Sequence, residues 1–147
     1  MKLQIAAALA LFITASAIAQ DLSTATPIAG DWSYAPAADG SEAAFANGSG
    51  RQLFVHCTRA TRRVTIARPA AVAATSMRVW TSSLERSVPS SFNPATGRLT
   101  IDLANFDPLL DAIVSSRGRV AFTVGTQPSL VVPPWAELAR VIEDCRA

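Results

Sequence analysis

Two cysteines and one histidine are the residues of this 147-residue chain whose chemistry is easiest to define. Cys57 and Cys145 do not form a C-x-x-C redox motif, and together with His56 they are too few for a structural zinc site. Two cysteines allow one intrachain disulfide. We therefore expect a Cys57–Cys145 bridge in an exported chain, and two buried free thiols are the alternative.

No motif for catalysis or for binding a cofactor is found in the sequence. Gly48-Ser49-Gly50 lacks the G-x-S-x-G frame of a hydrolase nucleophile, and no zinc-protease, EF-hand, dinucleotide or phosphate-loop motif occurs. A serine–histidine pair would have to use His56, which lies next to a cysteine expected in a disulfide. We predict no catalytic residue, no metal site and no cofactor.

One candidate for binding is a patch of aromatic and charged residues. Phe54 and His56 alternate with Cys57 along an expected strand, and Arg78 and Trp80 alternate along another. If these strands are neighbours, the four residues form one recognition patch, because aromatic residues and Arg dominate binding hot spots. The alternative is that a helix or a second sheet covers this face.

A second candidate is the segment that joins an expected helix to an expected strand. Arg117 and Arg119 flank Gly118 there, and two guanidinium groups with turn amides can form an anion site. The alternative, which we favour, is an ordinary helix exit in which Gly118 supplies an unusual backbone dihedral.

Charge is unevenly distributed along the chain. Residues 20–50 carry four acids and no base, residues 51–98 carry eight arginines and one acid, and residues 101–147 carry six acids and four arginines. One interpretation is a basic surface for an acidic partner, such as an anionic polysaccharide, a lipid headgroup or nucleic acid. We favour pairing of the central arginines with acids from both ends, and the net charge of +2 argues against nucleic acid.

The sequence pattern that positions these candidate residues is mainly one of short strands separated by turns. The pattern predicts a mainly β fold, either a β-sandwich or an open barrel, in a single domain over residues 31–147. Strands are expected at residues 31–35, 42–46, 52–58, 63–67, 77–82, 98–103, 120–124 and 130–132.

Two helices interrupt the strands. An Asp-Pro pair predicts a short internal helix over residues 109–115. A C-terminal amphipathic helix packed on the sheet follows two prolines, with Trp135, Leu138 and Cys145 on its buried stripe. Because Cys57 lies on the apolar face of its strand, both thiols should point into one core. We expect this helix to detach first if the bridge is lost, on the assumption that its other anchors are few.

The start of the chain indicates export. A lysine is followed by an apolar run over residues 5–19 that ends in an A-x-A cleavage site, which predicts a signal peptide over residues 1–19 and a loose leader over residues 20–30. A membrane anchor is the alternative, but the run is shorter than the ~20 residues of a spanning helix. We therefore expect a periplasmic or secreted protein with no membrane span after cleavage.

The sequence resembles a group of small exported proteins. SSRGRVAFTV over residues 115–124, LVVPPWAELARVIEDCR over residues 130–146 and GDWSY over residues 30–34 resemble uncharacterised exported proteins of alphaproteobacteria, especially of sphingomonad type. In architecture alone the chain is similar to the invasion-associated locus B proteins, which are exported β-rich domains. The first resemblance implies a Gram-negative periplasm, and the second carries no function or site.

These observations favour an exported, periplasmic, non-enzymatic domain that binds a protein or a component of the cell envelope. Two alternatives remain. One is a hydrolase that acts on envelope material with dispersed acidic, serine or histidine residues, and the other is an inhibitor of a hydrolase.

Overall fold

The computed structural model describes residues 21–147, so the predicted signal peptide lies outside the described residues. Nine strands and two helices make up the described chain. In chain order they are β1 (Asp31–Ala37), β2 (Gly40–Asn47), β3 (Gly50–Thr58), β4 (Arg63–Pro69), β5 (Ser76–Trp80), β6 (Glu85–Asn93), β7 (Arg98–Ala104), α1 (Pro108–Val114), β8 (Val120–Val124), β9 (Leu130–Val132) and α2 (Ala136–Arg146).

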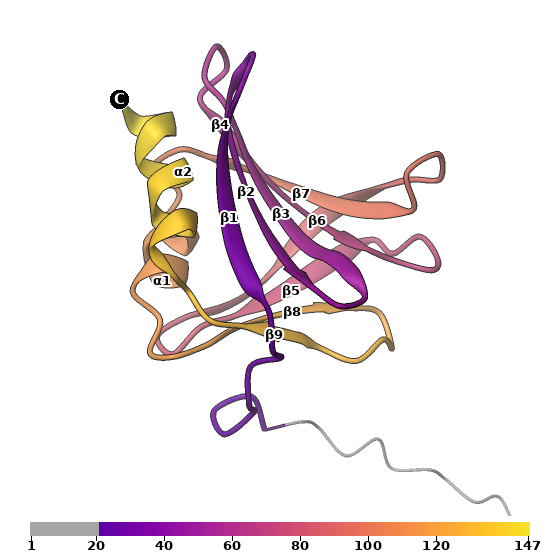
Figure 1. Cartoon of the computed structure of the whole chain (residues 1–147). Helices are drawn as coiled ribbons and strands as arrows, with labels where there is room; N and C mark the ends of the chain where they lie inside the picture. The colour runs from indigo at the N-terminus through magenta and orange to yellow at the C-terminus, as the bar shows by residue number, and fades with distance from the viewer. Residues whose placement is uncertain (1–20) are drawn as a thin grey trace, which may run out of the picture.

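The strands form one antiparallel sheet in the order β1-β2-β3-β4-β7-β6-β5-β8-β9. The sheet curls into a half-barrel, so that β1–β4 stand upright over β5, β8 and β9, and both helices lie on one side of it (Figure 1). This confirms the mainly β fold with a short internal helix and a C-terminal helix packed on the sheet.

The core lies on the inner face of the curled sheet. Phe45 of β2 and Phe122 of β8 are fully buried there, and α2 contributes Leu138, Val141 and Ile142, which have no exposed surface. Each such side chain stabilises the fold by about 1.5–3 kcal/mol when it leaves water. Because this face carries the core, the outer face of β2, β3, β4 and β7 can carry polar residues.

The start of α1 is fixed by Asp107, as the Asp-Pro pair predicts. Its Oδ1 accepts a hydrogen bond from the Leu109 backbone N–H at 2.9 Å, and Arg86 Nη2 contacts both carboxylate oxygens at 2.8 and 2.9 Å. Burial raises the pKa of Asp107, but the bonds from Arg86 and Leu109 outweigh it, so the pKa lies below its usual 3.8. The cap and the ion pair therefore tie α1 to β6.

The Cys57–Cys145 disulfide is present and confirms the predicted pairing. The two Cα atoms are 5.5 Å apart, and the residues have 0% and 1% of their surface exposed. Beside the bridge, Asn105 Nδ2 donates to the Cys145 carbonyl at 3.1 Å, and Arg146 contacts Asp111 at 2.8 Å. The bridge thus joins β3 to the last turn of α2, and polar contacts surround it.

The leader packs on the sheet, unlike the loose segment expected from the sequence. Leu22 is only 5% exposed and packs against Ala121 and Val131, with Trp80 beside them. Farther along, the Ile28 backbone N–H donates to the Val131 carbonyl at 2.9 Å. The physical reasons are the apolar Leu22 side chain and the unpaired edge of β9, which together hold this segment in place.

Two further features differ from the expectations. No strand was expected at β6, where only Val88 is buried and the polar pattern with a proline gives no clear alternation. Trp135 was placed on the buried stripe of the last helix but is 45% exposed. It is the N-cap residue, with an extended ψ of 173°, so helical phase does not apply to it.

Candidate functional site

The structure does not bring the four residues of the expected recognition patch together. Phe54 and His56 lie on β3, whereas Arg78 and Trp80 lie on β5, and β4, β7 and β6 separate these two strands in the sheet. Trp80 is half-buried against the leader, and Arg78 forms an ion pair with Glu85 at 3.0 Å. Only the Phe54–His56 half of the patch therefore remains a candidate.

Arg117 and Arg119 also have separate surroundings. The Arg119 guanidinium donates to the Ser23 carbonyl and so holds the leader. Arg117 is exposed, and its backbone N–H donates to Ser82 Oγ at 2.9 Å. Gly118 between them has a φ of 73°, the unusual dihedral expected of it, but it lies three residues beyond Ser115, the C-cap of α1, and so belongs to the turn that leads into β8.

A groove of about 270 Å³ lies on the outer face of the sheet, on the side away from α2, and contains Phe54 and His56. Sheet register explains the hollow: the neighbours of Phe54 across the strands are small, Ala44 on β2 and Ala67 on β4, with Thr100 beyond on β7. The groove is lined by Glu42, Phe54, His56, Thr65, Ala67, Asn93, Thr96, Arg98 and Thr100.

Arg98 is the cation of this groove. Its guanidinium carbon lies 3.6 Å from the centre of the Phe54 ring, which leaves Phe54 only 5% exposed. Within residues 21–147, no hydrogen bond or ion pair engages the Arg98 side chain. Stacking on an aromatic ring holds the planar donor fork in place without using its N–H groups, so they remain available to a ligand.

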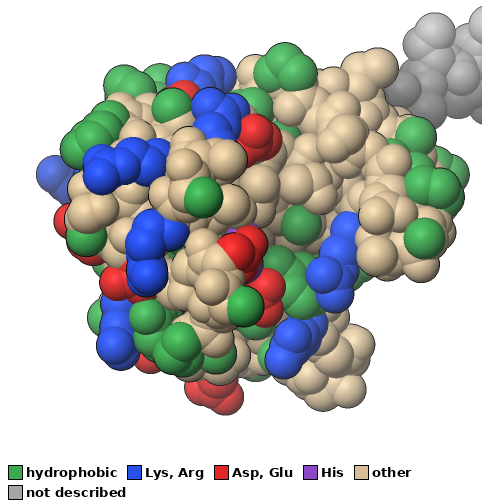
Figure 2. Space-filling view, turned by 90° about the horizontal axis from the view of Figure 1, so that it is seen from above, with side chains coloured by type: hydrophobic (Ala, Val, Ile, Leu, Met, Phe, Trp, Pro, Cys, Tyr) green, Lys and Arg blue, Asp and Glu red, His purple; other side chains and the backbone are tan. Residues whose placement is uncertain are grey.

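The opposite part of the groove is acidic and surrounds the histidine. His56 Nε2 lies 3.1 Å from Asp39 Oδ2, and His56 Nδ1 lies 3.9 Å from Glu42 Oε2. The hydrogen bond with His56 lowers the pKa of Asp39. In the view from above, acidic side chains lie beside the histidine, and arginine side chains border the adjoining hollow (Figure 2). The groove is therefore cationic at Arg98 and anionic near His56.

The walls between these two regions carry neutral polar groups. Asn93 Oδ1 accepts the Ala95 backbone N–H at 2.9 Å, which closes the β6–β7 turn and leaves the Asn93 NH₂ group without a partner among residues 21–147. Thr96 stands on the same turn, and Thr65 and Thr100 stand on the floor. The Thr65 and Thr96 hydroxyls donate to the His56 and Asn93 carbonyls at 3.5 and 3.4 Å, so they offer acceptor lone pairs to a ligand, whereas the Asn93 amide can donate.

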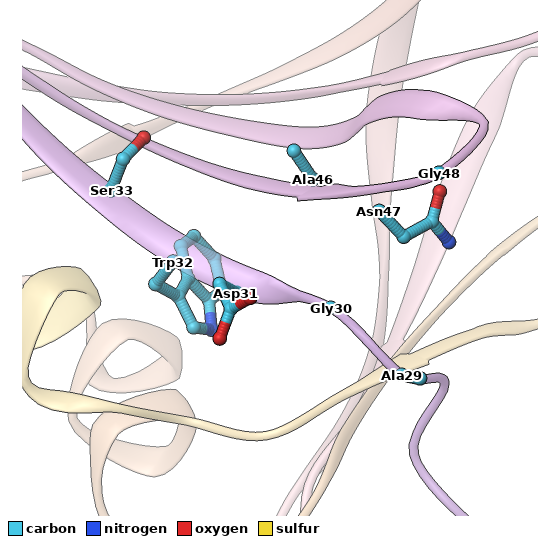
Figure 3. A pocket seen from close by; sticks show the side chains of 8 residues that line it. All are labelled: Ala29, Gly30, Asp31, Trp32, Ser33, Ala46, Asn47 and Gly48. Carbon is cyan, nitrogen blue, oxygen red and sulfur yellow. The ribbon is translucent and has the colours of Figure 1, made fainter.

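A second hollow, of about 520 Å³, lies where the chain enters β1, beside the turn between β2 and β3 (Figure 3). It is shallow and lined by the segments Ala29–Ser33 and Ala46–Gly48. Gly30 is needed here because an added Cβ would lie 2.5 Å from the Ala46 carbonyl oxygen. Asp31 is the charged residue of this hollow, which gives it fewer groups for recognition than the groove.

Half of the eight central arginines pair with acids, and in three of these four pairs the acid comes from one of the two ends of the chain, as favoured from the charge distribution. Arg51 contacts Glu42 from the N-terminal segment at 3.8 Å. Arg63 contacts Asp102 at 3.0 Å and Arg86 contacts Asp107, both from the C-terminal segment. Arg98 has no ion pair among residues 21–147, and its guanidinium lies over the Phe54 ring at the groove.

The sequence did not single out Arg98, Asp39 or Glu42. A signal was present for Arg98, since it has the same strand phase as Thr100, opposite to the buried Leu99. That phase places it on the outer face but does not say that it reaches Phe54 on another strand. Asp39 and Glu42 meet His56 only through the pairing of β2 with β3.

Within the described residues there is no group of three or more side chains suited to hold a metal ion, and no helix long and apolar enough to cross a membrane. Comparison of the chain with protein-family models, with curated proteins and with solved structures finds no match.

Proposed function

We propose that the protein is an exported, periplasmic, non-enzymatic domain that binds a component of the cell envelope in the groove on the outer face of its sheet. The observation that carries the proposal is Arg98, an arginine without an acidic partner that is stacked on a buried ring and faces an open groove. The contact with the ring stabilises the position of the guanidinium, and because its N–H groups are left without an acidic partner, they are prepared for a ligand.

Export is supported by the apolar N-terminal run and by the disulfide. A bridge between β3 and α2 persists in an oxidising compartment and is rare in the cytosol. The test is mass spectrometry of the protein from the envelope of its host, and Gln20 is the expected first residue. Recovery of a chain that begins at Met1 would contradict cleavage.

A hydrolase that uses His56 is less well supported than binding. A general base needs one ring nitrogen within about 2.6–3.2 Å of the group that it activates. In residues 21–147, Nε2 faces Asp39 and Nδ1 faces Glu42, so both nitrogens point to carboxylates and neither to a serine or threonine hydroxyl. This arrangement suits a fixed hydrogen-bonding wall of a binding groove.

The binding proposal is tested by photo-crosslinking in intact host cells. A benzophenone amino acid replaces Thr96, which is exposed at the rim of the groove, and in a matched control it replaces Ala136. Ala136 is exposed at the start of α2, which packs on the other face of the sheet. We expect light-dependent adducts from position 96 and not from position 136. Equal adducts from both positions, or none from position 96, would refute the groove as the binding site.

A further inference from the structure

The ligand class can be narrowed from the chemistry of the groove, and this step rests on the proposed binding function. We propose that the groove binds an acidic sugar, a uronic acid unit of an oligosaccharide, whose carboxylate pairs with Arg98. The charge of the groove, the hydrogen-bonding groups of its floor and its size all favour this ligand.

The charge of the groove calls for one anionic group near Arg98. A guanidinium presents parallel N–H donors that match the two oxygens of a carboxylate, and such charge-assisted pairs are stronger than neutral hydrogen bonds. The contact with the Phe54 ring, at 3.6 Å from the guanidinium carbon to the ring centre, already holds this side chain in place. Little side-chain entropy is then lost when a carboxylate binds.

The acidic region limits how much negative charge the ligand carries. Asp39 and Glu42 stand around His56, and they would repel a second anion placed along the groove. A polyanion with a charge on every unit fits this distribution poorly. An oligosaccharide in which one uronic acid unit adjoins neutral units fits it well, because the hydroxyls of the neutral units can donate to Glu42.

The floor of the groove favours a sugar over an extended peptide. Peptides commonly bind sheets by pairing their main chain with an unpaired strand edge. Here the floor is formed by β3, β4 and β7, and each of these strands already has a neighbour on both sides. A ligand therefore meets side chains, chiefly Thr65, Thr100 and Asn93, whose hydroxyl and amide groups match sugar hydroxyls.

The size of the groove agrees with a small unit of ligand. A volume of about 270 Å³ lies just below the range of ~300–1,000 Å³ that holds drug-sized molecules. One sugar ring would occupy the groove, and its neighbours in the oligosaccharide would extend past the rim. Affinity for a single unit should accordingly be weak, and we expect it to rise with a di- or trisaccharide.

The test is binding of defined sugars to the full chain, expressed with its own signal sequence so that processing takes place. Saturation-transfer NMR and calorimetry compare a trisaccharide that contains one galacturonic acid with the same trisaccharide in which that carboxylate is an amide. A peptide with a free C-terminal carboxylate is the third ligand. We expect the affinity for the acidic trisaccharide to be about tenfold higher than for its amide, or more, because the amide lacks the charge-assisted pair.

Variants assign the effect to the groove. Arg98→Gln should weaken binding of the acidic trisaccharide about tenfold or more and should make the acid and the amide bind alike. Arg117→Gln is the matched control, since Arg117 is exposed and lies outside the groove. This variant should bind the acidic trisaccharide as tightly as the unaltered protein does. Arg98→Lys keeps the charge but loses the planar fork, so it should restore only part of the affinity. Unfolding curves of all variants show whether they are folded.

Several results would overturn the sugar proposal. They are equal binding of the acid and the amide, unchanged binding by Arg98→Gln, tighter binding of the peptide than of the sugar, and no detectable binding of any uronic acid sugar. If the groove binds another ligand, any of these results can occur together with light-dependent crosslinks from position 96. An absence of groove-specific crosslinks would instead refute the binding function itself.

Discussion

Removing the disulfide tests how the domain is held together. In a Cys57→Ala/Cys145→Ala variant, the constraint on a loop of 88 residues is lost. The chain-entropy relation gives a cost of about 4–5 kcal/mol for a loop of that length. Both sites are buried, with 0% and 1% exposure, so the missing sulfur atoms also leave a small void. Against a total stability of about 5–15 kcal/mol for a small domain, this loss removes from about a third to nearly all of the free energy of unfolding.

The structure changes what should happen to α2 in that variant. The sequence led us to expect early detachment of this helix for want of other anchors, but its anchors are numerous. Three of its side chains have no exposed surface, the Tyr34 hydroxyl donates to Asp144 at 2.8 Å, and Arg146 binds both Asp111 and the Asn105 carbonyl. Burial raises the pKa of Asp144, but Tyr34 and nearby arginines lower it overall, as expected for a carboxylate held in its charged form. We now expect α2 to unfold together with the sheet.

The assay is urea unfolding of the oxidised protein, the reduced protein and the double-alanine variant, with hydrogen exchange of α2 peptides in parallel. The variant should lose about 4–5 kcal/mol and show a larger m-value, because its unfolded state is more expanded. A loss below about 1 kcal/mol with an unchanged m-value would contradict the loop-entropy argument. Exchange of α2 well before the strands would contradict the anchoring argument.

Three smaller predictions follow from individual contacts. Asp107→Asn keeps the helix cap but loses the pair with Arg86, so it should cost about 1 kcal/mol and Asp107→Ala about 2 kcal/mol in urea unfolding. The pKa of Asp107 in the folded protein lies below its usual 3.8, so the charged carboxylate stabilises the fold at pH values above 3.8. This stabilisation is lost as the pH falls through the folded-state pKa, and Asp107→Asn should lack this acid-sensitive part of the stability. Trp80→Ala should cost about 1–3 kcal/mol and speed proteolysis of the leader, and an unchanged melting temperature would refute its packing role. Gly40→Ala should cost about 3 kcal/mol or more, since the new Cβ would lie 1.9 Å from a β3 carbonyl oxygen, while Gly48→Ala, with nothing within 4 Å, should be neutral in thermal unfolding.

Most of the fold could be predicted from local patterns in the sequence. Alternation placed Cys57 inward on β3, and helical phase placed Cys145 inward on α2, so the bridge followed from two local arguments. Strand β6 was missed because a strand with one buried residue, Val88, leaves almost no periodic signal. Trp135 was misplaced because the phase was extended one residue beyond the helix.

The candidate site could be predicted only in part, because it depends on which strands become neighbours. Phe54 and His56 were assigned correctly to the face opposite Cys57, but the four-residue patch required that β3 and β5 be neighbours. In the structure β4 and β7 lie next, and they bring Arg98 over the Phe54 ring. Strand order is set by long-range packing of the whole sheet, and no short stretch of sequence carries that information.

The way in which the two ends of the domain meet bears on how the chain folds in time. Strands β1 to β4 form consecutive hairpins and can assemble as soon as their residues are free. The residues that complete the contacts of these strands come last in the chain. Ile28 of the leader pairs with Val131, Trp32 Nε1 donates to the Pro133 carbonyl at 2.7 Å, and Cys57 forms its disulfide with Cys145. A chain delivered from its N-terminus therefore passes through a stage in which the apolar inner face of four strands is open. At that stage Cys57 is an unpaired thiol that can react with the wrong partner, so folding yield should depend on a chaperone and an oxidant acting late.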